Sequence, residues 1–560
     1  MSNLLYESFK EVDRLGLFSE NYELPSYLQD NLKDELRYYQ KEAIRYLHYA
    51  QASVDAGSRY NHLLFHMATG SGKTMVMAAA ILYLFKKHGY QNFIFFVHTD
   101  AIIQKTKENL LNELSSKYLF KQPLEIEGER ITIEAVEIFP ASPQKNTVYL
   151  KLSTIHKIHN ELNSYRENSI TYEDLKETSL VLLGDEAHHF NAITRSSGSR
   201  LTSAVQESLT WERTVQNILN LNKKNRLLEF TATINLNNEA ILEKYKDKII
   251  YQYDLKRFML DGYSKKVMLI EANQSDEDKM LDAVLLSQYR KLVAQEHSIH
   301  NFKPIVLFKS PQIAVSNSKQ EAFNQLIEGL TPSKISEHLN NKTKFLSSSS
   351  SVWHQVITYY GKAQLLTITQ QIQQDFAPMN ILNVNKQDIL EEYPVLLNTL
   401  EDPDNPFRTI FAVAKVNEGW DVLNLYDIVR ISEKATKNKT GTDSEAQLIG
   451  RGARYYPFVY QGERSYSRRF DAMASDLAIL EQMHYHTINE TVYINNLHNS
   501  LEQSDLSFTV DGSALVHHAK LKSSFKKSAI YQQGKVDPSQ FNRQSVPLKQ
   551  HNNFVHIEWD

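Results

Sequence analysis

A glycine-rich segment near the start of the chain has the residue types and spacing of a phosphate-binding turn. Residues 69–74 read Thr-Gly-Ser-Gly-Lys-Thr between a short apolar run, 63–65, and a longer apolar stretch, 75–80. A buried strand, a tight turn and a helix in this order direct backbone N–H groups toward one anion, and glycine allows close approach. Lys73 would reach the β- and γ-phosphate oxygens of a nucleotide, and Thr74 would offer its hydroxyl to Mg²⁺. The predicted phosphate ligands are Thr69, Gly70, Ser71, Gly72, Lys73 and Thr74.

An acidic pair farther along the chain supplies the chemistry that the glycine-rich turn lacks. Asp185 and Glu186 follow the apolar run 180–183 and begin the sequence Asp-Glu-Ala-His, which ends at His188. Asp185 would complete the metal shell together with Thr74, and Glu186 would orient or deprotonate the attacking water. Each segment alone is ambiguous, because glycine-rich turns occur in proteins without nucleotides and Asp-Glu is common in solvated turns. Together they predict a site that hydrolyses ATP with Mg²⁺.

Three further polar positions in the first half of the chain fit a nucleotide site. Gln40 lies about thirty residues before the glycine-rich turn, and its amide could pair with the donor and acceptor of an adenine edge. Thr231 and Thr233 follow the apolar run 227–230, where their hydroxyls could bond the loop that ends at His188 and sense the state of hydrolysis. An ordinary turn at the end of a strand is the alternative for both threonines, and a glutamine by itself is not informative.

The second half of the chain contains two segments suited to the same site. Gly419 and Asp421 follow a predicted strand, a position suited to contacts with a nucleic-acid backbone and with the ribose side of a nucleotide. Gln447, Arg451 and Arg454 come next, and the spacing of the two arginines places both on one face of a predicted helix. An arginine that reaches the γ-phosphate accelerates hydrolysis by roughly 10³–10⁵. Surface charge is the ordinary explanation for two such arginines, but the flanking glycines and Gln447 favour a functional role.

The pattern of apolar runs predicts the elements that hold these residues. Short apolar runs separated by helical segments are typical of parallel sheets wrapped by helices, an α/β fold. The stretch 253–263 is a predicted connector between two such series, so we expect two lobes joined by a hinge. After 471 the pattern weakens, with one predicted helical segment near 477–501. The predicted strands are 93–97, 148–152, 180–183, 227–230, 304–308, 409–413 and 427–431.

Composition limits the class of protein but does not select one. The chain has 560 residues, enough for about three or four domains, and an ordinary globular apolar content of 42%. It has no cysteine, which excludes disulfides and thiol catalysis, and its longest apolar run, 75–85, is too short to span a bilayer. With no signal-peptide pattern in 1–17, we expect a soluble cytoplasmic protein. A net charge of −4 gives no global sign of nucleic-acid binding, although 62 basic residues allow a local basic groove.

Taken in order from Gln40 to Arg454, these segments resemble the motifs of superfamily-two helicases of the DEAD/DEAH-box kind. Within that group, residues 67–74, 417–421 and 447–454 are most similar to the restriction (Res) subunit of type III restriction–modification enzymes. The resemblance implies two tandem RecA-like lobes that bind ATP and Mg²⁺ between them, with nucleic acid across both. The expected parts are an N-terminal segment at 1–35, an ATP-binding lobe at 36–255, a second lobe at 256–470 and a small mixed C-terminal extension at 471–560.

The same resemblance assigns roles to individual residues. It implies that Gln40 recognises adenine, that Glu186 activates water, and that Arg451 and Arg454 act on the γ-phosphate. Thr231 stands where many relatives have serine, a change that keeps the hydroxyl. The implied ligands of nucleotide and metal are Lys73, Thr74 and Asp185.

The implied function is an ATP-dependent DNA translocase or helicase, acting on duplex DNA with a methyltransferase or nuclease partner. Type III restriction subunits usually carry a nuclease built on an Asp and an acidic-x-Lys triplet. After Asp471 no Asp or Glu is followed two residues later by Lys, so the nuclease lies outside this sequence or the protein is a motor alone. The alternatives are an RNA helicase of the same superfamily and a nucleotide-gated scaffold in a phage-defence complex.

Overall fold

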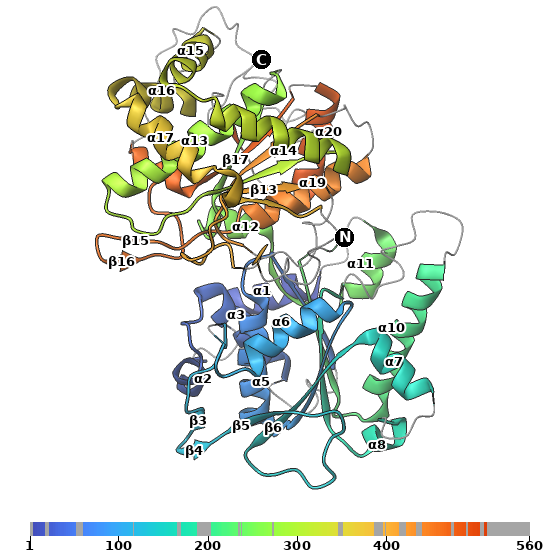
Figure 1. Ribbon diagram of the computed structural model, residues 1–560. Helices are drawn as coiled ribbons and strands as arrows, with labels where there is room; N and C mark the ends of the chain where they lie inside the picture. The colour runs from blue at the N-terminus through green and yellow to red at the C-terminus, as the bar shows by residue number, and fades with distance from the viewer. Residues whose placement is uncertain are drawn as a thin grey trace, which may run out of the picture.

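The chain folds into two α/β lobes that follow one another in sequence (Figure 1). The computed structural model describes residues 4–16, 22–51, 60–115, 117–164, 170–187, 203–232, 234, 236, 238–271, 274–344, 346, 351–385, 396–397, 399–413, 422–432, 439–471, 475–488, 491–503 and 509–511.

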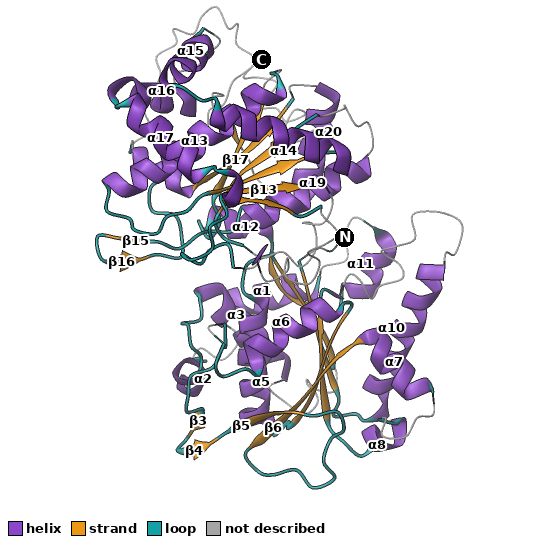
Figure 2. Ribbon diagram, in the orientation of Figure 1, coloured by secondary structure: helices purple, strands orange, loops and turns teal. Residues whose placement is uncertain are grey.

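The first lobe is built on a seven-stranded sheet in which every strand pairing is parallel (Figure 2). The strands lie in the order β5-β6-β2-β7-β8-β1-β9. A strand covered by helices on both faces needs a continuous apolar run, and residues 93–97 of β2 are all buried. The strands are β1 (His62–Met67), β2 (Asn92–Val97), β5 (Thr132–Ala135), β6 (Thr147–Thr154), β7 (Leu180–Asp185), β8 (Arg226–Thr231) and β9 (Ile249–Tyr253), and a separate hairpin pairs β3 (Glu125–Ile126) with β4 (Glu129–Arg130).

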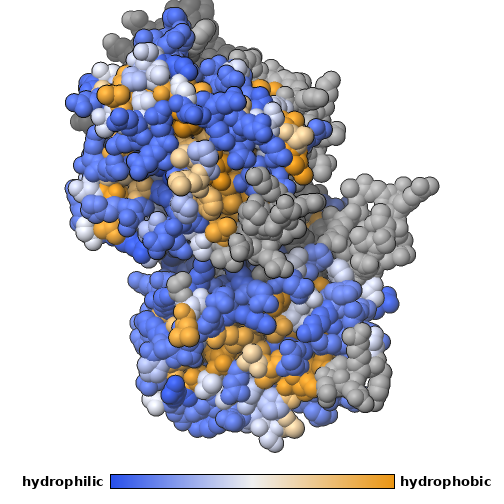
Figure 3. Space-filling view, viewed as in Figure 1, coloured by the Kyte–Doolittle hydropathy of each residue, from blue (hydrophilic) through white to orange (hydrophobic). Residues whose placement is uncertain are grey.

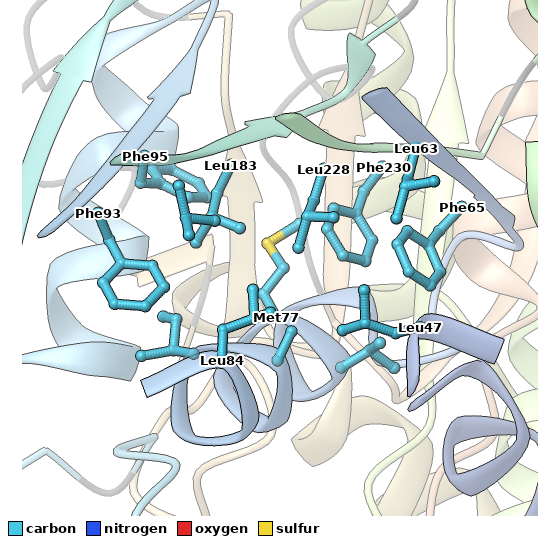
Figure 4. Close-up of a cluster of buried hydrophobic side chains, with 14 of the residues drawn as sticks. Leu47, Leu63, Phe65, Met77, Leu84, Phe93, Phe95, Leu183, Leu228 and Phe230 are labelled. Atoms are coloured by element: carbon cyan, nitrogen blue, oxygen red, sulfur yellow. The ribbon is translucent and has the colours of Figure 1, made fainter. Parts of the chain in front are cut away.

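Helices cover both faces of this sheet (Figure 1). Helix α5 is buried along most of its length, and Figure 4 shows Met77 and Leu84 of α5 facing Leu183, Leu228 and Phe230 of the strands. Burying each such side chain contributes roughly 1.5–3 kcal/mol, so this core fixes where α5 begins. The helices are α1 (Leu5–Arg14), α2 (Ser26–Asn31), α3 (Tyr38–Gln51), α5 (Lys73–His88), α6 (Asp100–Leu110), α7 (Ile155–Asn163), α8 (Tyr172–Lys176), α10 (Ser203–Leu221) and α11 (Glu239–Tyr245).

The second lobe repeats the plan with another seven-stranded parallel sheet, in the order β12-β13-β11-β14-β17-β10-β18. Its strands are β10 (Lys266–Glu271), β11 (Ile305–Lys309), β12 (Ile381–Asn383), β13 (Thr409–Ala412), β14 (Leu425–Arg430), β17 (Gln482–Thr487) and β18 (Thr509–Val510), with a hairpin of β15 (Val459–Tyr460) and β16 (Glu463–Arg464). Its helices are α13 (Asp276–Glu296), α14 (Ile313–Glu328), α15 (Pro332–Thr343), α16 (Val352–Lys362), α17 (Leu365–Asp375), α19 (Lys439–Gly452) and α20 (Thr491–Gln503), with short 3₁₀ turns η2 (Pro378–Asn380) and η4 (Asp476–Glu481).

Two parallel sheets flanked by helices confirm the predicted fold class, but the predicted C-terminal boundary at 470 is wrong. Strands β17 and β18 lie within the second sheet, and β17 pairs with both β14 and β10. The helical segment predicted near 477–501 is therefore a 3₁₀ turn, the interior strand β17 and then α20. At the other end, Tyr6 and Phe9 of α1 are buried in the core of the first lobe, so α1 belongs to that lobe as well.

A short connector joins the two sheets. Helix α12 (Leu255–Leu260) begins just after β9 and leads into β10, where a connector was predicted. Figure 3 shows a notch between the lobes on the left, and hydrophilic side chains over most of the face in view. Among the helices of the described ranges, none combines the length and the apolar character needed to cross a bilayer.

Candidate nucleotide-binding site

The glycine-rich turn links β1 directly to α5, which begins at Lys73. Gly70 and Gly72 have φ of +82° and +79°, the left-handed backbone that glycine adopts without a Cβ clash. The Ser71 hydroxyl donates to the Ala68 carbonyl at 2.7 Å and closes the turn on itself. The first N–H groups of α5 have no partner within the helix, so this end of α5 is suited to an anion.

Both glycines are also crowded by side chains from other elements. A Cβ on Gly72 would lie 2.5 Å from Nε2 of Gln40, and a Cβ on Gly70 would lie 3.0 Å from Cγ of Arg454. The turn therefore needs glycine for space as well as for backbone conformation. Gln40 belongs to α3 and Arg454 to the second lobe, so three distant parts of the chain meet at this turn.

Gln40 is buried and holds the turn through its amide. Its Nε2 donates to the Ser71 carbonyl at 2.9 Å, and its Oε1 accepts from the backbone N–H of Arg37 at 2.9 Å. A primary amide has two N–H groups and two acceptor lone pairs. These two bonds use one N–H group and one lone pair, which leaves one of each for a ligand. The structure thus places Gln40 at the turn, and its role toward adenine stays a prediction.

The acidic pair lies at the end of β7, on the same edge of the sheet as the turn. Glu186 has a φ of +51°, which is uncommon for a residue with a side chain, and its N–H donates to Oδ1 of Asp185 at 3.0 Å. Oε1 of Glu186 lies 3.9 Å from Nζ of Lys73, which is 9% exposed. The predicted catalytic residues of the first lobe are therefore brought together.

The charge balance at Asp185 favours binding of a cation. Burial and the neighbouring carboxylate of Glu186 raise the pKa of Asp185 to about 6, while the ammonium of Lys73 opposes this shift. A carboxylate with a raised pKa is stabilised by any additional positive charge beside it. Together with the Thr74 hydroxyl in the first turn of α5, Asp185 offers the hard oxygen ligands that Mg²⁺ prefers.

The two predicted arginines do not share a helical face. Helix α19 ends at Gly452, so Arg451 lies in its last turn and Arg454 lies beyond it. Arg454 instead forms an antiparallel bridge with Ser264 of the connector, and its aliphatic stem packs over Gly70. The last residue of the helix packs against the sheet, because a Cβ on Gly452 would lie 2.6 Å from Sδ of Met483 in β17.

Arg454 carries its charge into the site. Burial lowers the pKa of Arg454 to about 10, and the carboxylates of Glu186 and Glu401 oppose that shift. The guanidinium therefore stays protonated at neutral pH, between an acidic residue of each lobe.

The predicted coupling residues are only partly within the described ranges. Thr231 is the buried last residue of β8, and it lies in register with His66 of β1. Gln447 is an exposed residue of α19. His188, Thr233, Gly419 and Asp421 lie outside the described residues.

Several residues at this site were missed from the sequence. The Tyr39 hydroxyl donates to the Ser71 carbonyl at 2.8 Å. A cavity of about 220 Å³ opens beside Gly70, and the Arg37 guanidinium lies over the rings of Tyr263 at 4.7 Å and Tyr466 at 5.8 Å. The sequence does contain a signal, since Arg37 and Tyr39 stand directly before Gln40. The cavity is lined by Arg37, Gly70, Phe258, Tyr263, Leu423, Arg454, Tyr455, Pro457 and Tyr466.

The two parallel-sheet lobes, the phosphate-binding turn, the acidic pair and an arginine from the opposite lobe define the class of two-lobed P-loop helicases. A family model described as type III restriction enzyme, res subunit, matches residues 33–236, and a second model, described as an N-terminal region, matches residues 441–509. A probable type III restriction–modification enzyme HindVIP Res subunit of Haemophilus influenzae is 36% identical over 464 residues, which cover 76% of this chain and 88% of that protein. The chain belongs to the family of Res subunits of type III restriction–modification enzymes.

Two other proteins are similar to this chain over a smaller share of their own length. An uncharacterised protein of Haemophilus influenzae is 37% identical over 99 residues, which cover 17% of this chain and 21% of that protein. The solved structure of the helicase MrfA bound to DNA has a TM-score of 0.46 and 11% identity, covering 86% of this chain and 51% of that one.

Proposed function

We propose that the chain is the ATP-driven DNA motor of a type III restriction system and that DNA stimulates its hydrolysis of ATP. One observation carries the proposal: Arg454 of the second lobe lies on Gly70 of the first lobe, in the same turn that holds Lys73 3.9 Å from Glu186. A site assembled from both lobes is complete only at one lobe arrangement. Hydrolysis at such a site is therefore tied to the relative position of the lobes.

The residues present fit ATP and Mg²⁺. The left-handed glycines keep Cβ atoms out of the turn, and Lys73 supplies a cation for the β- and γ-phosphates. Thr74 and Asp185 would hold the metal, partly through water. When bound, Mg²⁺ would supply positive charge that offsets the negative charge of the phosphates.

The protein side chains would then divide the work of hydrolysis. Glu186 would orient the attacking water and accept its proton, and Arg454 would stabilise the charge that develops on the transferred phosphoryl group. Gln40 would select adenine while it holds the Ser71 carbonyl. Arg451, Thr231 and Gln447 would connect the site to the movement of the lobes.

The partners follow from the family. The relative's name places it in a restriction–modification enzyme, which supports duplex DNA as the track and a methylating subunit or a nuclease as the partner. An RNA helicase has less support, and a nucleotide-gated scaffold remains distinguishable by experiment. A cytoplasmic location stays a prediction of the sequence.

The test is steady-state ATP hydrolysis without nucleic acid and with duplex DNA, single-stranded DNA or RNA, at low and moderate salt. Lys73→Ala provides the blank, because it removes the cation from the phosphate-binding turn. Stimulation by duplex DNA that weakens with salt is expected, since phosphate contacts release counterions. Stimulation by RNA alone would move the protein to the RNA branch.

A second variant separates the motor from the scaffold. Glu186→Gln should bind ATP and fail to hydrolyse it, so that ATP stays trapped; a motor then loses function, while a scaffold that needs only binding retains it. Normal hydrolysis by Lys73→Ala or by Glu186→Gln would remove this assignment of the site.

A further inference from the structure

Tyr39, in the first turn of α3, contacts the phosphate-binding turn although it has no part in the chemistry above. Its ring is fully buried, and its hydroxyl donates to the Ser71 carbonyl at 2.8 Å. Nη1 of Arg37 donates to the same hydroxyl at 3.1 Å, and Nε2 of Gln40 shares the Ser71 carbonyl at 2.9 Å. Burial raises the pKa of Tyr39 to about 12, so the hydroxyl stays a donor at neutral pH. The Ser71 carbonyl is thus held by two side chains of α3.

The ring of Tyr39 extends this contact to the end of β9 and to the connector. It stacks on Tyr253 with centroids 4.0 Å apart and planes 8° apart, and it meets the edges of Phe258 and Tyr263 at 6.4 and 5.4 Å. Tyr253 also accepts from the backbone N–H of Ala68 at 2.9 Å, so it contacts the turn by a second route. Close-packed rings have few alternative arrangements, so a displacement at one end is passed on.

Beyond Tyr253 the contacts continue into the second lobe. The Tyr253 hydroxyl donates to Asp261 at 2.6 Å, and the Tyr38 hydroxyl donates to the same carboxylate. Asp261 is the C-cap residue just after α12, and Gly262 follows it. The Gly262 carbonyl accepts from the backbone N–H of Arg468, in the second lobe, at 2.8 Å. A continuous series of contacts therefore runs from Ser71 to Arg468.

We propose that Tyr39 is a positioning residue that couples the phosphate-binding turn to the interlobe connector through Tyr253 and Asp261. The proposal rests on the function proposed above and adds the route by which the state of the turn reaches the hinge. Binding of phosphates by the backbone of the turn shifts the Ser71 carbonyl, and the Tyr39 hydrogen bond transfers that shift to the stacked rings. Because a series of contacts is not by itself evidence of coupling, the test measures coupling directly.

Tyr39→Phe is the main variant, since it removes one hydroxyl and keeps the ring. The chain has no cysteine, so the exposed residues Ser142 of the first lobe and Ser333 of the second can be replaced by cysteine and labelled for energy transfer. In the full chain with duplex DNA, the KM for ATP, kcat and the change in energy transfer on adding a non-hydrolysable ATP analogue are measured. We expect KM within about threefold of the unsubstituted chain, kcat roughly three- to tenfold lower, and a nucleotide-dependent signal reduced by half or more.

Two comparisons separate coupling from a general structural effect. Tyr46→Phe, in the same helix, removes a buried hydroxyl that donates to Asp13 at 3.4 Å, and it should leave all three quantities unchanged. Asp261→Ala, at the exposed far end, should reproduce the kcat and signal losses of Tyr39→Phe, and the double variant should be no worse than either single one.

The outcomes are distinct. A normal kcat and signal in Tyr39→Phe, or losses that multiply in the double variant, would overturn the coupling. An unsubstituted chain that hydrolyses ATP with no nucleotide-dependent signal would overturn the coupling and leave the proposed hydrolysis standing. An unsubstituted chain that never hydrolyses ATP would overturn both.

Discussion

Each lobe holds an aspartate on a strand of its parallel sheet, and the two carboxylates are shifted in opposite directions. At Asp185, which ends β7, burial and Glu186 raise the pKa to about 6. At Asp427, inside β14, burial acts in the same sense, but Arg290 and then His486 outweigh it and hold the pKa below its ordinary value. Two buried aspartates on strands of similar sheets thus have opposite pKa shifts.

The contacts of the two aspartates explain the difference. Both side chains of the Arg290–Asp427 pair are fully buried, and Arg290 donates to both carboxylate oxygens. His486 adds a contact to Oδ1 of Asp427 at 3.0 Å. In the first lobe, the Lys73 ammonium is 3.9 Å from Glu186, and together with Lys105 it only partly offsets the effect of burial on the pKa of Asp185. Around Asp427, residues of the fold itself balance the negative charge. Around Asp185, the negative charge is only partly balanced and is arranged to receive a cationic ligand.

The largest expected effect concerns the charge that the second lobe brings to the first. Arg454→Ala should lower ATP turnover by about 10³–10⁵, because a guanidinium at the γ-phosphate stabilises the transition state by roughly 4–7 kcal/mol. The measurement is kcat with saturating DNA. Arg454→Lys serves as the control, because it keeps the charge and loses the planar fork. Turnover of Arg454→Ala within tenfold of the unsubstituted chain would exclude Arg454 from the reaction.

In the second lobe the corresponding disruption should affect folding. Asp427→Ala leaves the buried Arg290 without its carboxylate, which should lower the free energy of unfolding by about 3–5 kcal/mol. Urea unfolding of the nucleotide-free chain measures this loss, and the exposed Asp404→Ala is the control. A loss below about 1 kcal/mol would contradict the structural role given to this pair.

The parts of the fold and of the site that could be predicted from the sequence are those whose signal lies within one contiguous segment. The glycine-rich turn and the acidic pair are contiguous segments next to apolar runs, so their place at strand ends on the same edge of the sheet followed from the sequence. Tyr39 was missed because its contacts, Ser71 and Tyr253, come from distant segments. Strand β17 was missed because polar residues interrupt its apolar pattern: His484 and His486 are buried there beside Asp427.

The arginine pair shows a different limit of sequence reasoning. A spacing of three residues suggested one helical face for Arg451 and Arg454, but α19 ends between them. The helix ends where Gly452 meets β17, and a contact between an element and a strand thirty residues later leaves no local sign in the sequence. Arg454 still reaches the site, by pairing with the connector.

The opposite pKa shifts of the two aspartates also predict that removing their charges changes the free energy of unfolding in opposite directions. Asp185→Asn should raise the free energy of unfolding of the nucleotide-free chain by about 1 kcal/mol at pH 7.5, because a charge that burial disfavours is removed. The folded-state pKa of about 6 exceeds the unfolded value, so the folded state binds the extra proton as pH falls toward 5. The gain should therefore shrink between pH 7 and pH 5 in urea titrations.

Asp427 provides the contrasting pH profile for the same measurement. Its pKa is lowered in the folded state, so its contribution to stability is present at neutral pH and is lost only as pH falls below about 4, the unfolded value. The loss caused by Asp427→Ala should thus be unchanged between pH 7 and pH 5. Parallel pH profiles for Asp185→Asn and Asp427→Ala would contradict the assigned electrostatics.

The smallest expected effects concern the two glycines that flank α5, one in the phosphate-binding turn and one at the opposite end of the helix. Gly89, at the C-terminal end, has a φ of +72° and open space around it, so Gly89→Ala should cost only the left-handed strain of about 1 kcal/mol. Gly72, at the phosphate-binding end, has a φ of +79°, and a Cβ added there would lie 2.5 Å from Nε2 of Gln40. Gly72→Ala should add the loss of the Gln40–Ser71 hydrogen bond, about another 1 kcal/mol, and should raise the KM for ATP.

Gln40→Ala makes this last comparison decisive. In that background the crowding at Gly72 is absent, so Gly72→Ala should cost as much unfolding free energy as Gly89→Ala. Urea titrations of Gly89→Ala, Gly72→Ala, Gln40→Ala and the Gln40→Ala/Gly72→Ala double variant measure the cost of Gly72→Ala with and without Gln40. If Gly72→Ala costs the same with and without Gln40, then only backbone strain requires glycine at 72. If the extra cost disappears with Gln40, the turn is held in place by α3, the helix that also carries Tyr39.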